Sequence, residues 1–79
     1  MPKNHIVIAG EYTGPRDDGG HHISDGRCVR NLYPLGRDVL NGQEVGSQVT
    51  LTLALGDGSQ GSIFLIDGQQ YQQRGGVCL

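Results

Sequence analysis

The chain has 79 residues, of which 35% are hydrophobic and 18% are charged, and its formal net charge is -2 at pH 7. This length accommodates one domain, so we treat residues 1–79 as a single small domain, and the charge content is too low for a chain that is disordered throughout. The mildly acidic balance disfavours nonspecific nucleic-acid binding, and 14 glycines with no tryptophan favour short strands and tight loops over long helices.

The first expected element is a strand over residues 5–12, HIVIAGEY. Its alternation places Ile6 and Ile8 on one side and Val7 on the other. The apolar run over residues 6–9 is too short for the core of a signal peptide, and no other apolar run reaches membrane length. We therefore expect a soluble cytoplasmic protein that does not interact with a membrane.

The next stretch, RDDGGHHISDGRC over residues 16–28, contains side chains that could bind a metal ion. His21, His22 and Cys28 are the candidate ligands, and zinc is the candidate ion. Structural zinc sites usually combine two closely spaced pairs of ligands, whereas Cys28 has no second cysteine nearby and adjacent histidines point to opposite sides of an extended backbone. The favoured interpretation is a polar surface loop without a cofactor, with metal binding as the alternative.

The same stretch supplies the residue types of a nucleophilic triad. The candidates are Ser24 or Cys28 as nucleophile, His21 or His22 as base, and Asp25 as the acid. No nucleophile elbow accompanies them, and a chain with few large apolar residues has little material for a water-excluding pocket. We expect no enzyme activity.

A second strand is expected over residues 27–33, RCVRNLY, and Pro34 should end its pairing. The following PLGRDVLNG, residues 34–42, permits at most one helical turn because Gly36 weakens a helix. Cys28 and Cys78 are expected to be reduced thiols in the cytoplasm, although an oxidising compartment would let them close a loop worth roughly 4 kcal/mol. Their spacing does not show whether they are neighbours.

The third expected strand is VTLTLAL, residues 49–55, in which apolar residues alternate with threonine and alanine. The glycines of the following GDGSQG, Gly56, Gly58 and Gly61, match the spacing of the dinucleotide-binding fingerprint. That fingerprint needs a helix after the loop, and here another strand follows, so we expect an ordinary loop.

Residues 62–66, SIFLI, and residues 69–73, QQYQQ, form a predicted hairpin around Asp67-Gly68, which favours a two-residue type I′ turn. This turn pairs Phe64 with Tyr71, and Phe64, Ile66 and Tyr71 should face the core. The opposite face would present a mixed surface that is a candidate interaction site. Its residues are Ile63, Leu65, Gln70 and Gln72.

These elements predict a mainly β fold, with a β-rich α+β fold as the alternative: about five short, mostly antiparallel strands in a bent sheet or small barrel, a C-terminal three-stranded meander, and at most one short helix. We expect a small non-catalytic accessory or inhibitory module that binds another protein, or itself as a homodimer, through its sheet face or edge. The alternative is a small barrel that binds single-stranded nucleic acid through Arg27, Arg30 and Arg37 and stacks a base on Tyr12 or Tyr33. Aspartates interleaved with these arginines weigh against it.

Overall fold

The computed structural model describes residues 5–54 and 63–79, and all of its regular structure is β-strand. The six strands are β1 (His5–Pro15), β2 (His21–Ser24), β3 (Cys28–Pro34), β4 (Gln48–Ala54), β5 (Ile63–Ile66) and β6 (Gln69–Cys78). No helix occurs in the described residues, and so none there could cross a membrane. The mainly β prediction is confirmed.

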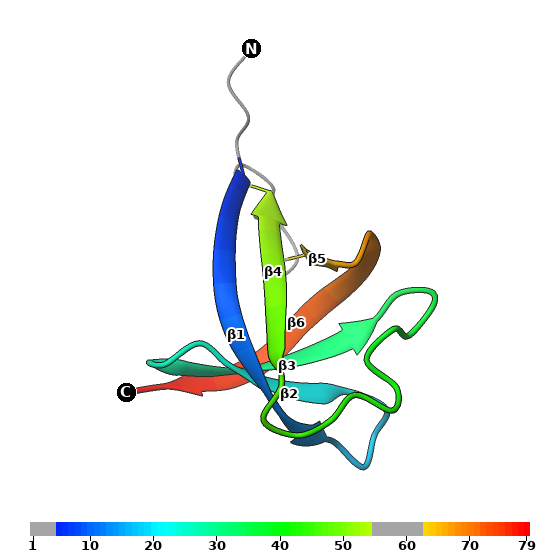
Figure 1. Ribbon diagram of the computed structural model, residues 1–79, viewed down its shortest axis with the longest axis horizontal. Helices are drawn as coiled ribbons and strands as arrows, with labels where there is room; N and C mark the ends of the chain where they lie inside the picture. The colour runs from blue at the N-terminus through cyan, green and yellow to red at the C-terminus, as the bar shows by residue number, and fades with distance from the viewer. Residues whose placement is uncertain (1–4, 55–62) are drawn as a thin grey trace.

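The strands close into an antiparallel barrel in the order β1-β2-β3-β6-β5-β4. The chain first forms the meander β1-β2-β3 and then the meander β4-β5-β6, and the two meanders join through the β1–β4 and β3–β6 pairs. Figure 1 shows β1 and β4 side by side, and β6 continuing from its turn with β5 to run along β3. Closure pairs the outer strands of both meanders, so every described strand has a paired neighbour on each side, although β4 and β5 pair only at Thr52–Leu65 and Leu53–Phe64.

The two longest strands, β1 and β6, contribute to this closure because the two ends of each pair with different neighbours. Residues 5–11 of β1 pair with β4, and residues 11–15 pair with β2 in a ladder that is interrupted by a register shift between Tyr12 and Gly14. β6 pairs first with β5 and then with β3, where another register shift lies between Arg30 and Leu32. Such irregularities bend a strand and increase its twist, which lets a short sheet curl into a barrel.

The C-terminal hairpin has the predicted register. Ile66 pairs with Gln69, and Phe64 with Tyr71. Asp67 and Gly68 both have positive φ, at 50° and 80°, as a type I′ turn requires. Phe64, Ile66 and Tyr71 are all buried, so the predicted inward face is confirmed.

The barrel interior is filled by side chains from all six strands and from the connection between β3 and β4. The buried apolar residues are Tyr12, Ile23, Leu32, Leu40, Val49, Leu51, Phe64, Ile66 and Tyr71. Leu40 belongs to the connection over residues 35–47, which forms turns in place of the helical turn that the sequence permits. Ser47 and Gly46 bond the backbone of Tyr12, so this connection is tied to β1.

One strand was not expected. Residues 21–24 lie within the predicted polar loop but form β2, which pairs with both β1 and β3. His21 and Ile23 are buried, whereas His22 and Ser24 are partly exposed. A four-residue strand with one aliphatic side chain has too weak an alternation to separate from a loop. The predicted glycine-rich loop at residues 56–61 lies outside the described residues.

Candidate interaction surface

The outer face of the β5–β6 hairpin carries the predicted interaction residues. Leu65 pairs with Gln70, and Ile63 pairs with Gln72, so the four side chains lie together on the side opposite Phe64 and Tyr71. Gln70 is exposed and the other three are half-buried. The sequence therefore placed these residues on one face correctly, while their role in binding stays a prediction.

This face continues across the neighbouring strands. Leu65 pairs with Thr52 of β4, and Thr52 pairs with Val7 of β1. The side chains of directly paired residues lie on the same side of a sheet, so Val7, Thr52, Leu65 and Gln70 form one transverse row. Val7 is 67% exposed, and the row thus presents aliphatic surface to solvent.

In the other direction the face reaches Tyr33, which pairs with Gln72 across β3 and β6. The ring of Tyr33 lies against the backbone of Gly20, where a Cβ atom would come within 2.7 Å of the ring. Its hydroxyl donates to the carboxylate of Asp18 at 2.7 Å. Packing and hydrogen bonding together hold this aromatic side chain in one orientation.

Two arginines flank the Tyr33 ring. The guanidinium carbon of Arg16 lies 5.9 Å from the ring centroid and that of Arg74 lies 5.5 Å away, both within cation–π range. Arg16 also donates to Asp18 at 3.1 Å, whereas Arg74 donates to Gln72 at 3.4 Å. The surface thus combines a fixed tyrosine, two cations and neighbouring aliphatic side chains.

The electrostatics around Asp18 keep this arrangement intact over a wide pH range. The hydrogen bond from Tyr33 and then that from Arg16 lower the pKa of Asp18 to about 2. The same hydrogen bond to Asp18 raises the pKa of Tyr33 above its ordinary value. The carboxylate therefore stays charged and the phenol stays protonated at neutral pH.

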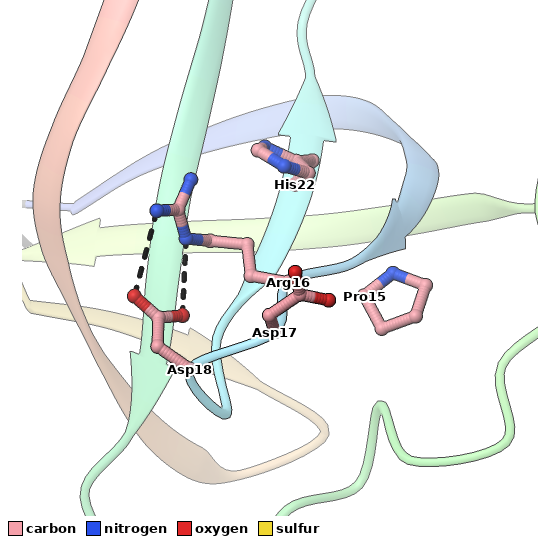
Figure 2. A pocket seen from close by; sticks show the side chains of 5 residues that line it. All are labelled: Pro15, Arg16, Asp17, Asp18 and His22. Atoms are coloured by element: carbon pink, nitrogen blue, oxygen red, sulfur yellow. Dashed lines mark hydrogen bonds and ion pairs between the residues drawn. The ribbon is translucent and has the colours of Figure 1, made fainter.

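A shallow hollow of about 290 Å³ lies beside this cluster, at the turn between β1 and β2. Figure 2 shows Arg16 turned toward Asp18, with His22 and Asp17 on other sides of the hollow. His22 is bonded through Nδ1 to the side chain of Asn31 at 3.1 Å. The hollow is polar and open, which suits contact with a protein surface better than enclosure of a small molecule.

The neighbouring His21 points into the barrel and is only 4% exposed. Its Nε2 lies 2.8 Å from Asp38, and its Nδ1 lies 2.8 Å from the hydroxyl of Tyr12. A carboxylate only accepts hydrogen bonds, so Nε2–H donates to Asp38, and in the neutral ring Nδ1 accepts from Tyr12. Both ring nitrogens of His21, which the sequence offered as a metal ligand, therefore make hydrogen bonds within the protein.

Asp38 connects this histidine to the other end of a buried polar network. Its second oxygen accepts a 2.7 Å bond from the hydroxyl of Tyr71, which in turn accepts bonds from the backbone N–H groups of Val39 and Leu40. Burial raises the pKa of Asp38, but the hydrogen bonds from His21 and Tyr71 outweigh it and the net shift is downward. Burial, and then the bond to Asp38, raise the pKa of Tyr71 to about 12.

The expectation of two reduced thiols is wrong, because Cys28 and Cys78 form a disulfide. The two residues are 50 positions apart in the sequence but directly opposite each other in the β3–β6 pair. Cys28 is thereby removed from the predicted metal-ligand set, and the described residues contain no cluster of three or more potential ligands. His21 and His22 point to opposite faces of β2, as their adjacent positions predict.

The three arginines of the nucleic-acid hypothesis do not form one patch. Arg27 precedes β3 and Arg37 follows it, so the seven residues of the strand separate them by roughly 20 Å. Arg30 lies between them but points inward, where it bonds Asp25 at 2.8 Å and Gln73 at 3.0 Å and covers the ring of Phe64.

Sequence reasoning missed the Tyr33 cluster and the buried network. Alternation along β3 places the side chains of Tyr33 and Leu32 on opposite faces of the sheet. Only the pairing of β3 with β6 brings Arg74 close to the Tyr33 ring. Asp38 is one of the aspartates interleaved with the arginines in the sequence, and no spacing pattern connects it to His21 or Tyr71. A comparison with protein-family models, curated proteins and solved structures found no match.

Proposed function

We propose that this protein is a small non-catalytic accessory or inhibitory module that binds another protein through the outer face of its β5–β6 hairpin. A second copy of the chain is the simplest such partner. The observation that carries the proposal is the outer face on which Ile63 and Leu65 of β5 lie beside Gln72 and Gln70 of β6, while Gln72 pairs in turn with Tyr33, whose ring is flanked by two arginines.

The composition of this face resembles the energetically important part of protein interfaces. Tyrosine and arginine are enriched among residues whose loss most weakens association, and such anchors are usually surrounded by apolar contacts that exclude water. Tyr33 is held in place before binding, which reduces the entropy cost of ordering it in a complex. Each described strand of the closed barrel already has two neighbouring strands, which leaves less room for a partner strand to add to a sheet edge. Binding through the outer face is therefore better supported than binding through an edge.

A non-catalytic role is supported by the state of the polar groups. Tyr12, His21 and Asp38 form a hydrogen-bonded chain, but Tyr12 and His21 are almost wholly buried and the chain ties the β3–β4 connection to the barrel. The nucleic-acid alternative has less support because Arg30 is engaged internally and its two companions lie at opposite ends of β3.

The expected cytoplasmic location and the Cys28–Cys78 bond favour different redox environments. Disulfides persist in oxidising compartments, whereas cytosolic reductants keep most thiols reduced. We retain the cytoplasmic location as a proposal under which the bond is reduced for part of the time. Alkylation of free thiols in intact cells, followed by mass spectrometry, measures the reduced fraction directly.

The proposal is tested by sedimentation velocity of the untagged protein over a range of concentrations, with Leu65→Glu as the test variant. Val45→Glu is the matched control, because Val45 is 62% exposed but lies in the β3–β4 connection and outside the proposed face. We expect concentration-dependent dimerisation of the wild type and the control, and its loss in Leu65→Glu. If all three are monomers, chemical cross-linking in cells should yield a partner adduct that Leu65→Glu alone loses. Equal cross-linking by both variants would overturn the proposal.

A further inference from the structure

The Cys28–Cys78 disulfide lies at the rim of the barrel, where the end of β6 meets the start of β3. Cys78 is exposed and Cys28 is half-buried. We propose that this disulfide is a thiol-exchange site, at which a low-molecular-weight thiol attacks Cys78 and releases residues 77–79 from β3 while the rest of the barrel stays folded. This inference is independent of the proposed binding face.

Residues 77–79 are held by few other interactions. Val77 pairs with Val29, and the N–H of Leu79 donates to the carbonyl of Arg27 at 2.9 Å. The side chains contribute little burial, since Val77 is 68% exposed and Leu79 is 96% exposed. The disulfide therefore adds a covalent attachment to a segment whose other attachments to β3 are backbone pairing and one further backbone hydrogen bond.

Two glycines in an unusual backbone conformation lie between this segment and the part of β6 that pairs over the core. Gly75 and Gly76 both have positive φ, at 81° and 147°, and they lie beside the register shift in β3. Before them, Gln73 and Tyr71 pair with Leu32 and Pro34 of β3, and Leu32 and Tyr71 are fully buried. Release of residues 77–79 thus leaves the core pairing of β3 with β6 in place.

A hollow of about 290 Å³ gives access to the bond. It is lined by Asp25, Arg27, Cys28, Arg30, Cys78 and Leu79. Asp25 and Arg30 pair with each other at 2.8 Å, and Arg27 has no carboxylate partner within the described part of the chain. The positive charge of Arg27 attracts an anionic thiol and favours departure of the Cys28 sulfur as a thiolate.

The exchange balances without a further reagent. An incoming thiolate bonds to the Sγ atom of Cys78, the bond to Cys28 breaks, and its electron pair leaves on the Cys28 sulfur, which water then protonates. Cys78 now carries the small thiol as a mixed disulfide. A second thiolate attacks the sulfur of the bound small thiol, which yields the free small-molecule disulfide and the Cys78 thiolate. One protein disulfide is reduced and two small thiols are oxidised.

The test incubates the native protein with reduced glutathione, quenches with acid, and maps adducts by peptide mass spectrometry. We expect one glutathione per chain, on Cys78. Arg27→Ala should slow formation of the adduct several-fold, whereas Arg37→Ala, an exposed arginine at the other end of β3, should leave the rate unchanged. An adduct on Cys28, a reaction that needs denaturant, or equal rates in the two arginine variants would overturn the proposal.

Hydrogen exchange followed by NMR separates local release from unfolding. In the glutathione adduct, and in Cys78→Ser without any thiol, the amide of Leu79 should exchange at least tenfold faster than in the oxidised protein. The amides of Leu51 and Phe64 in the barrel core should stay protected and should exchange far more slowly than the amide of Leu79, although loss of the cross-link makes global unfolding more frequent. Exchange of the core amides as fast as that of Leu79 would show that the whole barrel opens when the bond breaks, and would contradict the proposed local release.

Discussion

Asp38 is the residue on which the buried polar network depends. It accepts bonds from His21, from Tyr71 and from the backbone N–H of Leu40. These bonds join β2, β6 and the β3–β4 connection, which share no strand pairing with one another at this point. A single carboxylate therefore fixes a long irregular segment onto the end of the barrel.

We predict that Asp38→Asn destabilises the protein at pH 7 by about 1–3 kcal/mol, the cost of weakening a charged hydrogen-bond acceptor that is partly buried. The pKa of Asp38 is lowered by folding. Its ionised form therefore contributes stability above the unfolded pKa of about 4, and this contribution is lost as the pH falls through the folded pKa. Urea denaturation from pH 7 to pH 3 should show a smaller acid-dependent loss in the variant.

The matched control for this experiment is Asp17→Asn, since Asp17 is an exposed aspartate in the turn between β1 and β2. The control should follow the wild-type pH dependence. Identical slopes for Asp38→Asn and the wild type would show that Asp38 does not carry the predicted share of acid sensitivity.

For individual residues, the sequence indicated which side chains are polar, but it did not indicate their hydrogen-bond partners. The adjacency of His21 and His22 correctly predicted opposite faces, because side chains alternate along an extended backbone. The partners of His21 are 9 and 17 residues away in the chain. Such contacts depend on how the strands pair, so the sequence was compatible with a metal site or a polar surface loop and did not predict that His21 is buried.

Among the elements, the β1–β2 hairpin positions the Tyr33 cluster. Its turn carries Arg16 and Asp18, and Gly20 at its end touches the Tyr33 ring. A side chain at position 20 would occupy the place of the ring. The lack of a Cβ atom is thus what allows Tyr33 to lie flat against this hairpin and reach Asp18.

We predict that Gly20→Ala destabilises the protein by about 1–3 kcal/mol, because the added methyl forces Tyr33 to move. The displaced ring should also lose its hydrogen bond to Asp18, so the Asp18 pKa measured by NMR should rise from about 2 toward its ordinary value. Gly36→Ala is the control, since a Cβ atom there meets nothing within 4 Å. Equal stability of the two variants would contradict the close approach of Tyr33 to Gly20.

Elements differed in how well local sequence predicted them. The turn and the register of the β5–β6 hairpin were predicted correctly, because Asp67-Gly68 selects a two-residue turn and that turn fixes the register. β2 was missed, and β6 extends to Cys78 although its predicted strand ends at residue 73. Both depend on pairing with β3, which supplies hydrogen bonds to segments whose own patterns are weak.

For the whole molecule, the disulfide closes the loop from Cys28 to Cys78, a separation of 50 residues. We predict that the double variant Cys28→Ser, Cys78→Ser unfolds cooperatively with a free energy lower by about 4 kcal/mol, because the cross-link restricts the unfolded chain. Urea denaturation of both proteins without reductant measures the difference. A difference below about 1 kcal/mol would show that the unfolded chain is not significantly restricted by this bond.

The sequence by itself determined the fold class, the single small domain, the C-terminal hairpin and the inward side of its strands, because these follow from alternation and turn chemistry between neighbouring residues. Only the tertiary structure decided that the sheet closes, that Cys28 meets Cys78, and that Tyr33 lies between Arg16 and Arg74. Each of these depends on which strands become neighbours, as in the pairing of β3 with β6 and of β1 with β4. That choice is made by burial of the common core, and no local pattern encodes it.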